Sequence, residues 1–559
     1  MRERTDVLIV GASASGTCAA VQAGRMGRRV IVCEPSPWVG GMLTAAGVSA
    51  IDGNNMLPSG LWGEFREALR AHYGGADRLE TGWVSNTLFD PRVGERILRL
   101  WINALDTVDL RLGWRCTAVE RAGDRITGAR FVSAAGSQQR SIDATVTILA
   151  DEYGDGVVAA GLPWRVGLEA RDETGEPAAP EVALPHPQDF TWCATIGAPP
   201  SGFADASPGP TFAPGDEYER ILGDPPITWN RLLDYGRLPG DLLMLNWPTQ
   251  DCYGDYLDPS TRAEVTAAGR RKTARLIRAL AGAYGSAIRR PRVYPGGSYA
   301  LIPYIREARR IRAIATMTTA ALTAPHESSA LLSSVAVGDY PLDHHRANDP
   351  HAPRIDFPSI SAFCVPYGVL VPAGTGGVLV AEKSIGVTGL VNGCTRLQPV
   401  VMQLGQAAGA AAALCVSLGC EPGSLPVGVL QSVLLDAHAY LVPAIDAPAS
   451  HAAYRALHWC ATHGVLGLRY SSEGWANRAW IDPDEPLSAD AAARAAAALE
   501  GDASHGARAS HEAARIACRI AREAGQAVRA GRPPARHEFA SRIYGVVVEA
   551  SGGSARSSG

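Results

Sequence analysis

The chain has 559 residues, of which 46% are hydrophobic and 19% charged, a composition typical of a folded globular protein. Its length allows a large core and about two to four structural units. The 52 basic and 56 acidic residues give a formal charge of −4, which favours neither a nucleic acid nor an anionic membrane as partner. Because Lys272 and Lys383 are the only lysines, a lysine within a motif becomes informative.

The 11 cysteines lack the paired spacing of a zinc site or a disulfide framework, and no metal site is expected. The Cys415–Cys420 spacing resembles the redox pair of flavin disulfide reductases, but it follows an Ala-rich helix, so two buried thiols are expected. The first strand begins near Asp6, which leaves no signal peptide before it, and no apolar run approaches the about 20 residues that span a bilayer. We therefore expect a reduced, cytoplasmic protein.

An apolar strand at residues 7–10 leads into a glycine turn and then into a helix rich in small residues. Gly11 permits the sharp turn, and Gly16 lets the helix pack closely on the strand. The first N–H groups of the helix then face a pyrophosphate, whose negative charge the helix dipole favours. The residues expected to bind a dinucleotide here are Gly11, Ser13, Ala14, Ser15 and Gly16, with Ser13 at the position of the usual middle glycine.

The next strand, residues 29–33, ends in Glu34. A carboxylate about 20 residues after the first glycine accepts hydrogen bonds from the adenosine ribose hydroxyls. A second glycine pair then follows, as in FAD enzymes of the glutathione-reductase-like fold, whereas NAD dehydrogenases do not need this loop. The pattern therefore predicts FAD, bound here by Glu34, Pro35, Gly40, Gly41 and Met42.

Two further strands around a turn are expected at residues 115–120 and 122–132, where FAD domains of this type pass the adenine. An apolar strand at 144–150 ends in a loop that returns to the cofactor, although a purely structural loop is the alternative. The cofactor contacts expected from these segments are Ala118, Val119, Ala150, Asp151 and Gly154.

Composition predicts five parts of the chain. The expected parts are an FAD-binding domain at 1–165, a substrate or cap domain at 166–370, the second part of the FAD-binding domain at 371–420, a helical region at 421–550 and a flexible tail at 551–559. The cap is expected because prolines and aromatic residues multiply there, around one clear helix near 259–284. The apolar strand at 377–382 marks the return to the FAD-binding domain, and no chemistry is visible after residue 421.

A polar segment at residues 392–399 precedes a long helix from Val400 to about Leu418, which Gly419 ends. In FAD enzymes of this architecture, such a helix directs its N-terminus at the pyrimidine edge of the flavin and stabilises the negative charge of the reduced ring. The flavin contacts expected in this region are Glu382, Lys383, Arg396, Leu397 and Gln398.

The chain resembles a broad bacterial family of FAD-dependent oxidoreductases, some of whose members lie beside polysaccharide-lyase genes. Besides the N-terminal turn, the motifs that carry the resemblance are residues 40–45, 304–311, 337–345, 380–384 and 392–402. The resemblance covers residues 1 to about 440 and implies an α/β fold with a discontinuous Rossmann-type FAD domain of the glutathione-reductase-like kind, an inserted α+β cap and a helical C-terminal region. Ser13 and the Asp-Glu-Tyr-Gly-Asp sequence after Ala150 depart from most relatives.

The richest source of acid–base groups is the segment 339–345, which contains Asp339, Tyr340, Asp343, His344 and His345. A flavin that oxidises a C–H bond accepts a hydride at N5 while a nearby base removes a proton. His344 or His345 is the expected base, oriented by Asp343 or Asp339, and a pair of surface or supporting histidines is the alternative.

Arg306 belongs to a dense charged group with Glu307, Arg309 and Arg310. One or two of these arginines could clamp a substrate carboxylate, and a salt-bridge network between domains is the alternative. The first functional hypothesis is a dehydrogenase or oxidase that acts on a polar small molecule. Because no second glycine fingerprint for NAD(P)H is present, its electrons are expected to leave to dioxygen or another acceptor. A single-component monooxygenase and a non-catalytic flavin-binding protein are the alternatives.

Overall fold

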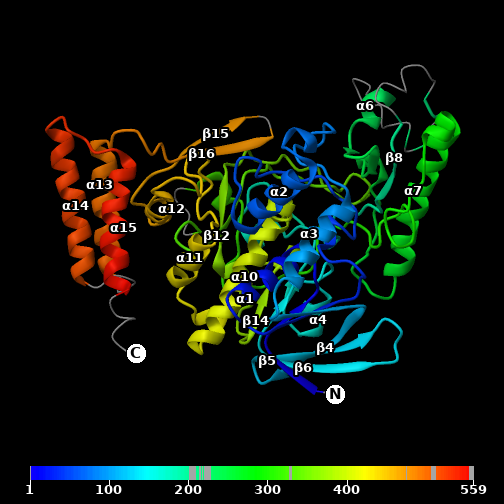
Figure 1. Ribbon diagram of the computed structural model, residues 1–559, viewed down its shortest axis with the longest axis horizontal. Helices are drawn as coiled ribbons and strands as arrows, with labels where there is room; N and C mark the ends of the chain where they lie inside the picture. Colours follow the sequence, from blue (N-terminus) through cyan, green and yellow to red (C-terminus); the bar gives the residue numbers. More distant parts are fainter. Residues whose placement is uncertain are drawn as a thin grey trace.

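A computed structural model describes residues 2–199, 209–212, 216, 218, 228–325, 330–473, 475–504 and 511–552. Its centre is a seven-stranded sheet with the strand order β3-β2-β1-β6-β5-β4, in which β14 also pairs with β6 (Figure 1). The strands are β1 (Arg2–Val10), β2 (Val30–Glu34), β3 (Val108–Leu112), β4 (Trp114–Ala122), β5 (Arg125–Ser133), β6 (Gln139–Leu149) and β14 (Val378–Val380).

The sheet is mixed, because β1, β2, β3, β6 and β14 run parallel whereas β4 and β5 form an antiparallel hairpin with β6. Val10 lies opposite Cys33 and Leu149, and Val380 also lies opposite Leu149. The carboxyl ends of these strands therefore meet at one edge, which is where open α/β sheets bind their ligands. The strand predicted at 377–382 is confirmed as β14.

Two helices pack directly on each other against this sheet, α1 (Ala14–Arg25) and α10 (Gln398–Leu418). Gly405 and Gly409 of α10 touch the backbone of Ser15 and Ala19, so neither position has room for a side chain. The α10 helix is long and apolar enough to cross a membrane by length and composition, contrary to the expectation that no apolar run has this length. Because 83% of its apolar window is buried inside the protein, it is a core helix.

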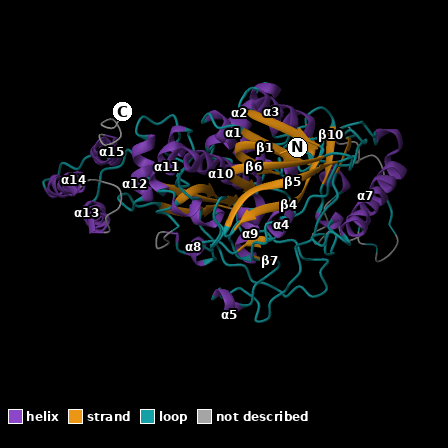
Figure 2. Ribbon diagram, turned by 90° about the horizontal axis from the view of Figure 1, so that it is seen from below, coloured by secondary structure: helices purple, strands orange, loops and turns teal. Residues whose placement is uncertain are grey.

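The remaining helices of this part surround the sheet, and Figure 2 shows α2 and α3 on one side of its strands and α4 on the other. They are α2 (Gly60–Tyr73), α3 (Pro91–Asn103), α4 (Asp155–Ala159), α5 (Arg171–Thr174), α8 (Ala320–Thr323), α9 (Gly389–Thr395) and α11 (Val427–Asp436). Two short antiparallel pairs complete this part, β7 (Trp164–Arg165) with β11 (Arg310–Ile311) and β12 (Ser334–Gly338) with β13 (Phe363–Pro366).

A second group of elements lies at one end of the molecule, beside the central sheet (Figure 1). It contains a three-stranded antiparallel sheet and two helices, namely β8 (Ala194–Gly197), β9 (Arg237–Leu238), β10 (Leu242–Leu245), α6 (Trp229–Leu233) and α7 (Arg262–Tyr284). These elements have a hydrophobic cluster of their own, which includes Ile196, Leu243 and Leu276. The helix predicted near 259–284 is confirmed as α7.

The C-terminal region lies at the opposite end (Figure 1) and is helical apart from one hairpin. Its elements are α12 (Tyr454–Thr462), β15 (Arg469–Glu473), β16 (Ala476–Trp480), α13 (Ala489–Ser504), α14 (His511–Arg529) and α15 (Arg536–Gly552). The hairpin corrects the expectation of helix throughout 421–550. Its strands are short and largely polar, so no apolar period marked them in the sequence. Of the tail predicted at 551–559, the first two residues end α15 and the rest lie outside the described residues.

Candidate functional site

The glycine turn joins β1 to α1 at the carboxyl edge of the sheet. Gly11 has a φ of +94°, a conformation that favours glycine, and a Cβ on Gly16 would overlap the carbonyl oxygen of Gly11. Ser13 caps α1, because its Oγ accepts a hydrogen bond of 3.2 Å from the N–H of Gly16. The turn thus has the backbone of a dinucleotide-binding fold, with Ala14 and Ser15 in its first helical turn.

Glu34 ends β2 beside this turn. Its carboxylate accepts one 2.8 Å hydrogen bond from the N–H of Ala12 and another from the N–H of Ser36. Pro35 lies between Glu34 and Ser36 in the chain. Burial raises the pKa of Glu34 to about 8, although these two hydrogen bonds favour the carboxylate. The acid predicted to bind ribose therefore lies at the glycine turn, bonded to its backbone.

The second glycine pair runs alongside the first turn. The N–H of Gly40 donates a 2.8 Å hydrogen bond to the carbonyl of Ala12, and Gly40 has a φ of +94°. Gly41 and Met42 begin a short 3₁₀ helix, Gly41–Leu43, which is buried. A Cβ on Gly41 would overlap the carboxylate of Glu152.

The other predicted cofactor residues from this half lie on β4 and after β6. Ala118 and Val119 are on β4, where Val119 packs in a buried cluster with Cys33 and Leu149. The N–H of Ala150 donates to the carbonyl of Val10, which places Ala150 next to the glycine turn. Asp151 accepts hydrogen bonds from Asp155 and Gly156 at the start of α4, with Gly154 at the N-cap, and burial raises the pKa of Asp151 to about 6.

A buried cluster of three charged residues stands between these loops. The Oε2 atom of Glu382 accepts a 3.1 Å hydrogen bond from the N–H of Ser15, in the first turn of α1. Lys383 Nζ donates to Glu382 Oε1 at 2.7 Å and to Glu152 Oε2 at 2.5 Å. Burial favours the neutral amine, but the two carboxylates outweigh it and hold the pKa of Lys383 above its usual value. Sequence analysis included Glu382 and Lys383 in the site but missed Glu152.

The start of α10 carries the remaining predicted residues. Leu397 occupies the N-cap position of α10. The side-chain amide of Gln398 accepts a hydrogen bond from the N–H of Asp52 and donates one to the carbonyl of Ala50. The guanidinium of Arg396 donates to Asp343 Oδ2 at 2.7 Å and to the hydroxyl of Tyr304 at 2.8 Å. Arg396 therefore turns toward a neighbouring cavity.

That cavity has a volume of about 620 Å³. Residues from the glycine-loop side, from the second group of elements and from the C-terminal hairpin surround it. Its polar wall includes Asp52, Arg306, Asp339, Tyr340, Asp343, His345 and Arg396. Six of the residues that sequence analysis proposed for chemistry or flavin contact are thus brought together, while His344 is not among the lining residues.

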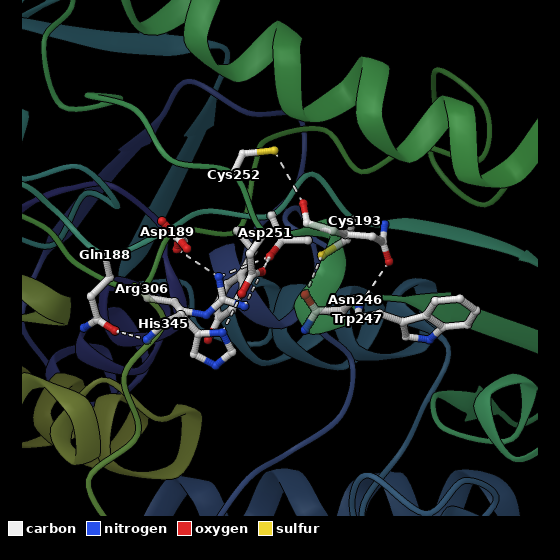
Figure 3. A network of polar contacts seen from close by, with 12 residues as sticks. Gln188, Asp189, Cys193, Asn246, Trp247, Asp251, Cys252, Arg306 and His345 are labelled. Atoms are coloured by element: carbon white, nitrogen blue, oxygen red, sulfur yellow. Dashed lines mark hydrogen bonds and ion pairs between the residues drawn. The ribbon is translucent and has the colours of Figure 1, made fainter. Parts of the chain in front are cut away.

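His345 is held between two carboxylates on the cavity wall. Its Nδ1 atom lies 2.6 Å from Asp251 Oδ2 (Figure 3). Its Nε2 atom lies 3.4 Å from Asp343 Oδ2. Its backbone N–H donates to the side chain of Gln188. The imidazole therefore has a fixed orientation while its side chain stays 22% exposed, as a base that meets a substrate requires.

Asp251 links this histidine to Arg306, whose Nη2 donates to Asp251 Oδ1 at 3.0 Å. Burial alone would raise the pKa of Asp251, but the charge of Arg306 and the hydrogen bond from His345 outweigh it and lower that pKa. Asp251 is thus an ionised, buried carboxylate. Sequence analysis missed it, because no local pattern around Cys252 marks it as part of a site.

His344 points away from the cavity. Its Nε2 atom lies 2.9 Å from the carbonyl oxygen of Leu390, and its ring stacks on Phe357 at 4.8 Å. Burial and the neighbouring charge of Arg346 together lower the pKa of His344 to about 3. Of the two histidines predicted as base, the structure places only His345 where a substrate can reach it.

The charged group at 306–310 is divided between the cavity and a structural network. Arg306 faces the cavity, whereas Arg309 pairs with Asp155 and Arg310 pairs with Glu169 and Glu307. Glu307 also accepts from Arg346. The salt-bridge alternative therefore applies to Arg309 and Arg310, whereas Arg306 lies at the cavity and is paired with Asp251.

Three acidic or aromatic residues on the other wall complete the site. The carboxylate of Asp339 accepts a 2.6 Å hydrogen bond from the N–H of Asn54, and burial raises the pKa of Asp339 to about 6. Burial and the neighbouring Asp343 raise the pKa of Asp52 to about 7, a residue that sequence analysis missed. Tyr340 stacks on Trp475 of the C-terminal hairpin, with ring centroids 6.0 Å apart.

Trp475 and Glu473 bring the C-terminal region to the cavity, a position that the sequence did not predict. The N–H of Asn477 in β16 donates to the carbonyl of Asp339, so the hairpin is fixed to the 339–345 segment by backbone. The side chain of Trp475 is 72% exposed. An exposed ring at the mouth of a polar cavity offers a flat contact surface to a substrate.

The comparison with known families decides the identity of this fold. Residues 6–434 match the family described as FAD dependent oxidoreductase. The chain belongs to this family. FAD is the cofactor of these FAD dependent oxidoreductases, and the predicted α/β, Rossmann-like fold with a helical C-terminus is confirmed.

Solved structures with a similar fold are distant. The geranylgeranyl bacteriochlorophyll reductase-like protein of Thermoplasma acidophilum is 10% identical over 83% of this chain and 88% of its own, with a TM-score of 0.35. The p-nitrophenol 4-monooxygenase of Pseudomonas putida is 13% identical over 82% and 90%, also with a TM-score of 0.35. No curated protein sequence matches the chain. The description of the family names no specific reaction, so the family does not fix the reaction type.

The backbone of this FAD dependent oxidoreductase fits its cofactor. The turn at Gly11, the first N–H groups of α1 and the end of β2 at Glu34 form the cradle in which dinucleotides bind. A Cβ at Gly16 would disrupt that cradle. The side chains of Glu152 and Glu382, in contrast, fill part of it.

Proposed function

We propose that this FAD dependent oxidoreductase oxidises a polar small molecule bound in the 620 Å³ cavity, with His345 as the base that removes a substrate proton. Bound FAD would supply the acceptor for the hydride, which carries both electrons of the oxidation. The observation that carries the proposal is the imidazole of His345, held between Asp251 and Asp343 at the cavity wall.

The two carboxylates give His345 distinct roles for its two nitrogens. An ionised Asp251 favours the tautomer with the proton on Nδ1, which leaves a lone pair on Nε2. Nε2 can then accept a proton from a substrate hydroxyl or amine. Asp343, 3.4 Å from Nε2, stabilises the imidazolium that results. Burial alone would raise the pKa of Asp343, but the contact with His345 and the charge of Arg396 outweigh it and hold this pKa well below its usual value.

The charges on the cavity wall indicate the kind of substrate. Arg306 is paired with Asp251 and Arg396 with Asp343, so the two cations are already balanced by two anions. An uncharged polar substrate fits this balance better than a molecule with several negative charges, which would have to displace both aspartates. We therefore propose a hydroxyl- or amine-bearing molecule that packs on Tyr340 and Trp475.

Anaerobic mixing of the FAD-loaded protein with neutral alcohols, polyols and amines tests this proposal. The expected result is bleaching of the flavin absorbance by at least one class, and slow bleaching in H345Q. Release of hydrogen peroxide in air would identify dioxygen as the electron acceptor. NAD(P)H consumption stimulated by substrate would support the monooxygenase instead. If neither the tested substrates nor NAD(P)H reduced the bound FAD, the non-catalytic flavin-binding protein would be supported.

A further inference from the structure

The first turn of α1 already holds a negative charge that belongs to the chain. The N–H of Ser15 donates to the carboxylate of Glu382, from a residue 367 positions away in the sequence. In dinucleotide-binding folds, the free N–H groups at this helix start bind the pyrophosphate of the cofactor. Glu382 thus makes the hydrogen bond that the fold offers to a phosphate oxygen.

Neighbouring charges hold Glu382 in this place. Glu382 is 0% exposed and Lys383 is 2% exposed, and the ammonium of Lys383 bridges Glu382 and Glu152. Buried charges need such partners, because desolvation is costly. Two carboxylates and one ammonium leave one net negative charge, which the positive end of the α1 dipole stabilises.

The backbone at Glu382 is also unusual. Glu382 has a φ of 60°, in the left-handed region that favours glycine. A long side chain at such a position is uncommon, and residues held in this conformation cluster at functional sites. A glycine here would relax the backbone and remove the carboxylate.

Glu152 closes the space on the opposite side. Its Oε2 atom accepts from Lys383, while its Oε1 atom is buried and lies against Gly41. The second glycine loop is therefore in contact with a carboxylate where the FAD-binding fold runs along the cofactor. Both glycine loops face acidic side chains across the same buried space.

We propose that Glu382, clamped by Lys383 and Glu152, is an internal anion in the phosphate position of the cofactor site, and that FAD binds only when this carboxylate is displaced. The pyrophosphate and Glu382 carry like charges and need the same N–H of Ser15, so both cannot occupy the site together. The inference rests on the cofactor of the family and is independent of which substrate the protein oxidises.

Titration of purified apoprotein with FAD, followed by the quenching of flavin fluorescence, tests the proposal without any activity measurement. E382Q keeps the shape of the side chain and removes its charge, and E382G removes the side chain at a position whose φ suits glycine. Each variant is expected to bind FAD at least tenfold more tightly than the natural protein, which corresponds to about 1.4 kcal/mol. E64Q, at an exposed carboxylate on α2, is the matched control and should bind like the natural protein.

Equal affinities of the natural protein, E382Q and E382G would overturn the inference and leave the FAD-based function intact. Weaker binding by both variants would overturn it too, because Glu382 would then be a ligand of FAD. If none of the folded proteins bound FAD, the inference and the proposed function would both fail. Thermal unfolding shows which variants are folded. If E382Q does not fold, the comparison of folded E382G with the natural protein is sufficient for the test.

Discussion

The Nδ1 atom of His345 lies 2.6 Å from the Oδ2 atom of Asp251, a residue 94 positions earlier in the chain. Asp251 is 3% exposed and is also paired with Arg306, so it remains ionised and holds the imidazole in one orientation. The far nitrogen of the ring faces the cavity beside Asp343. This relationship makes His345 the residue on which the proposed chemistry depends.

Replacement of His345 by glutamine should lower kcat by about 10²- to 10⁴-fold, the usual contribution of a general base. FAD affinity should stay within about twofold, because His345 lies on the cavity wall and makes none of the contacts at the glycine turn. Single-turnover reduction of the flavin by substrate measures the first effect, and FAD titration the second.

H344Q is the matched control, since His344 is the neighbouring histidine but packs on Phe357 outside the cavity. Its kcat should remain within a few-fold of the natural value, even where stability falls. A loss of kcat in H344Q as large as that in H345Q would show that the assignment of the base is wrong.

The raised pKa of Asp52 predicts a pH dependence of stability. Burial and Asp343 place this pKa at about 7, above the about 4 of an unfolded chain. The folded state therefore keeps a proton that the unfolded state releases, so the free energy of unfolding should fall as pH rises from about 4 to about 7 and then level off. D52N should lose this part of the dependence, measured by urea unfolding at pH 5 and pH 8.

The natural protein, unfolded in urea at the same two pH values, is the reference for that measurement. If D52N and the natural protein lost the same stability between pH 5 and pH 8, Asp52 would not be the group that titrates.

The parts of the fold that sequence patterns predicted are those set by neighbouring residues. The turn at Gly11, the packing glycine at Gly16 and the acid at Glu34 follow from one strand–turn–helix–strand unit, and the end of α10 at Gly419 follows from local capping. Local pattern carries this information because turns and caps depend on a few consecutive residues.

The missed residues meet only through tertiary structure. Asp251 and Asp52 come from loops without a motif, and Glu152 comes from the predicted cofactor loop after Ala150. Each becomes significant only because a distant residue lies beside it. The hairpin that carries Trp475 was missed because its strands lack an apolar period. In β16 the buried residues are Asn477 and Ala479, and neither is a large apolar residue that would mark a strand in the sequence.

Trp475 should contribute to substrate binding rather than to the chemical step. W475A removes the ring that stacks on Tyr340 at the cavity, so KM should rise by about 2- to 10-fold while kcat stays nearly constant. W475F keeps an aromatic ring and should restore most of the affinity. Steady-state kinetics with the substrate found by flavin bleaching gives both constants, and an unchanged KM in W475A would exclude the hairpin from the substrate site.

The close approach of α1 to the glycine turn predicts a stability effect. In G16A the new Cβ would overlap the carbonyl oxygen of Gly11, and overpacking of this kind costs about 1–3 kcal/mol. Gly282 in α7 has open space around its Cβ position, so G282A should instead stabilise the protein, by about 0.5–1 kcal/mol. Urea unfolding of both variants checks the pair, and a G16A as stable as the natural protein would contradict the packing described.

The most direct test of the account is the binding of FAD by the purified protein, measured by titration and by the visible spectrum before and after denaturation and filtration. The account predicts saturable binding of FAD, a flavin band near about 450 nm that bleaches with substrate, and release of the flavin on denaturation. The absence of FAD uptake by both the folded natural protein and folded E382G would contradict it.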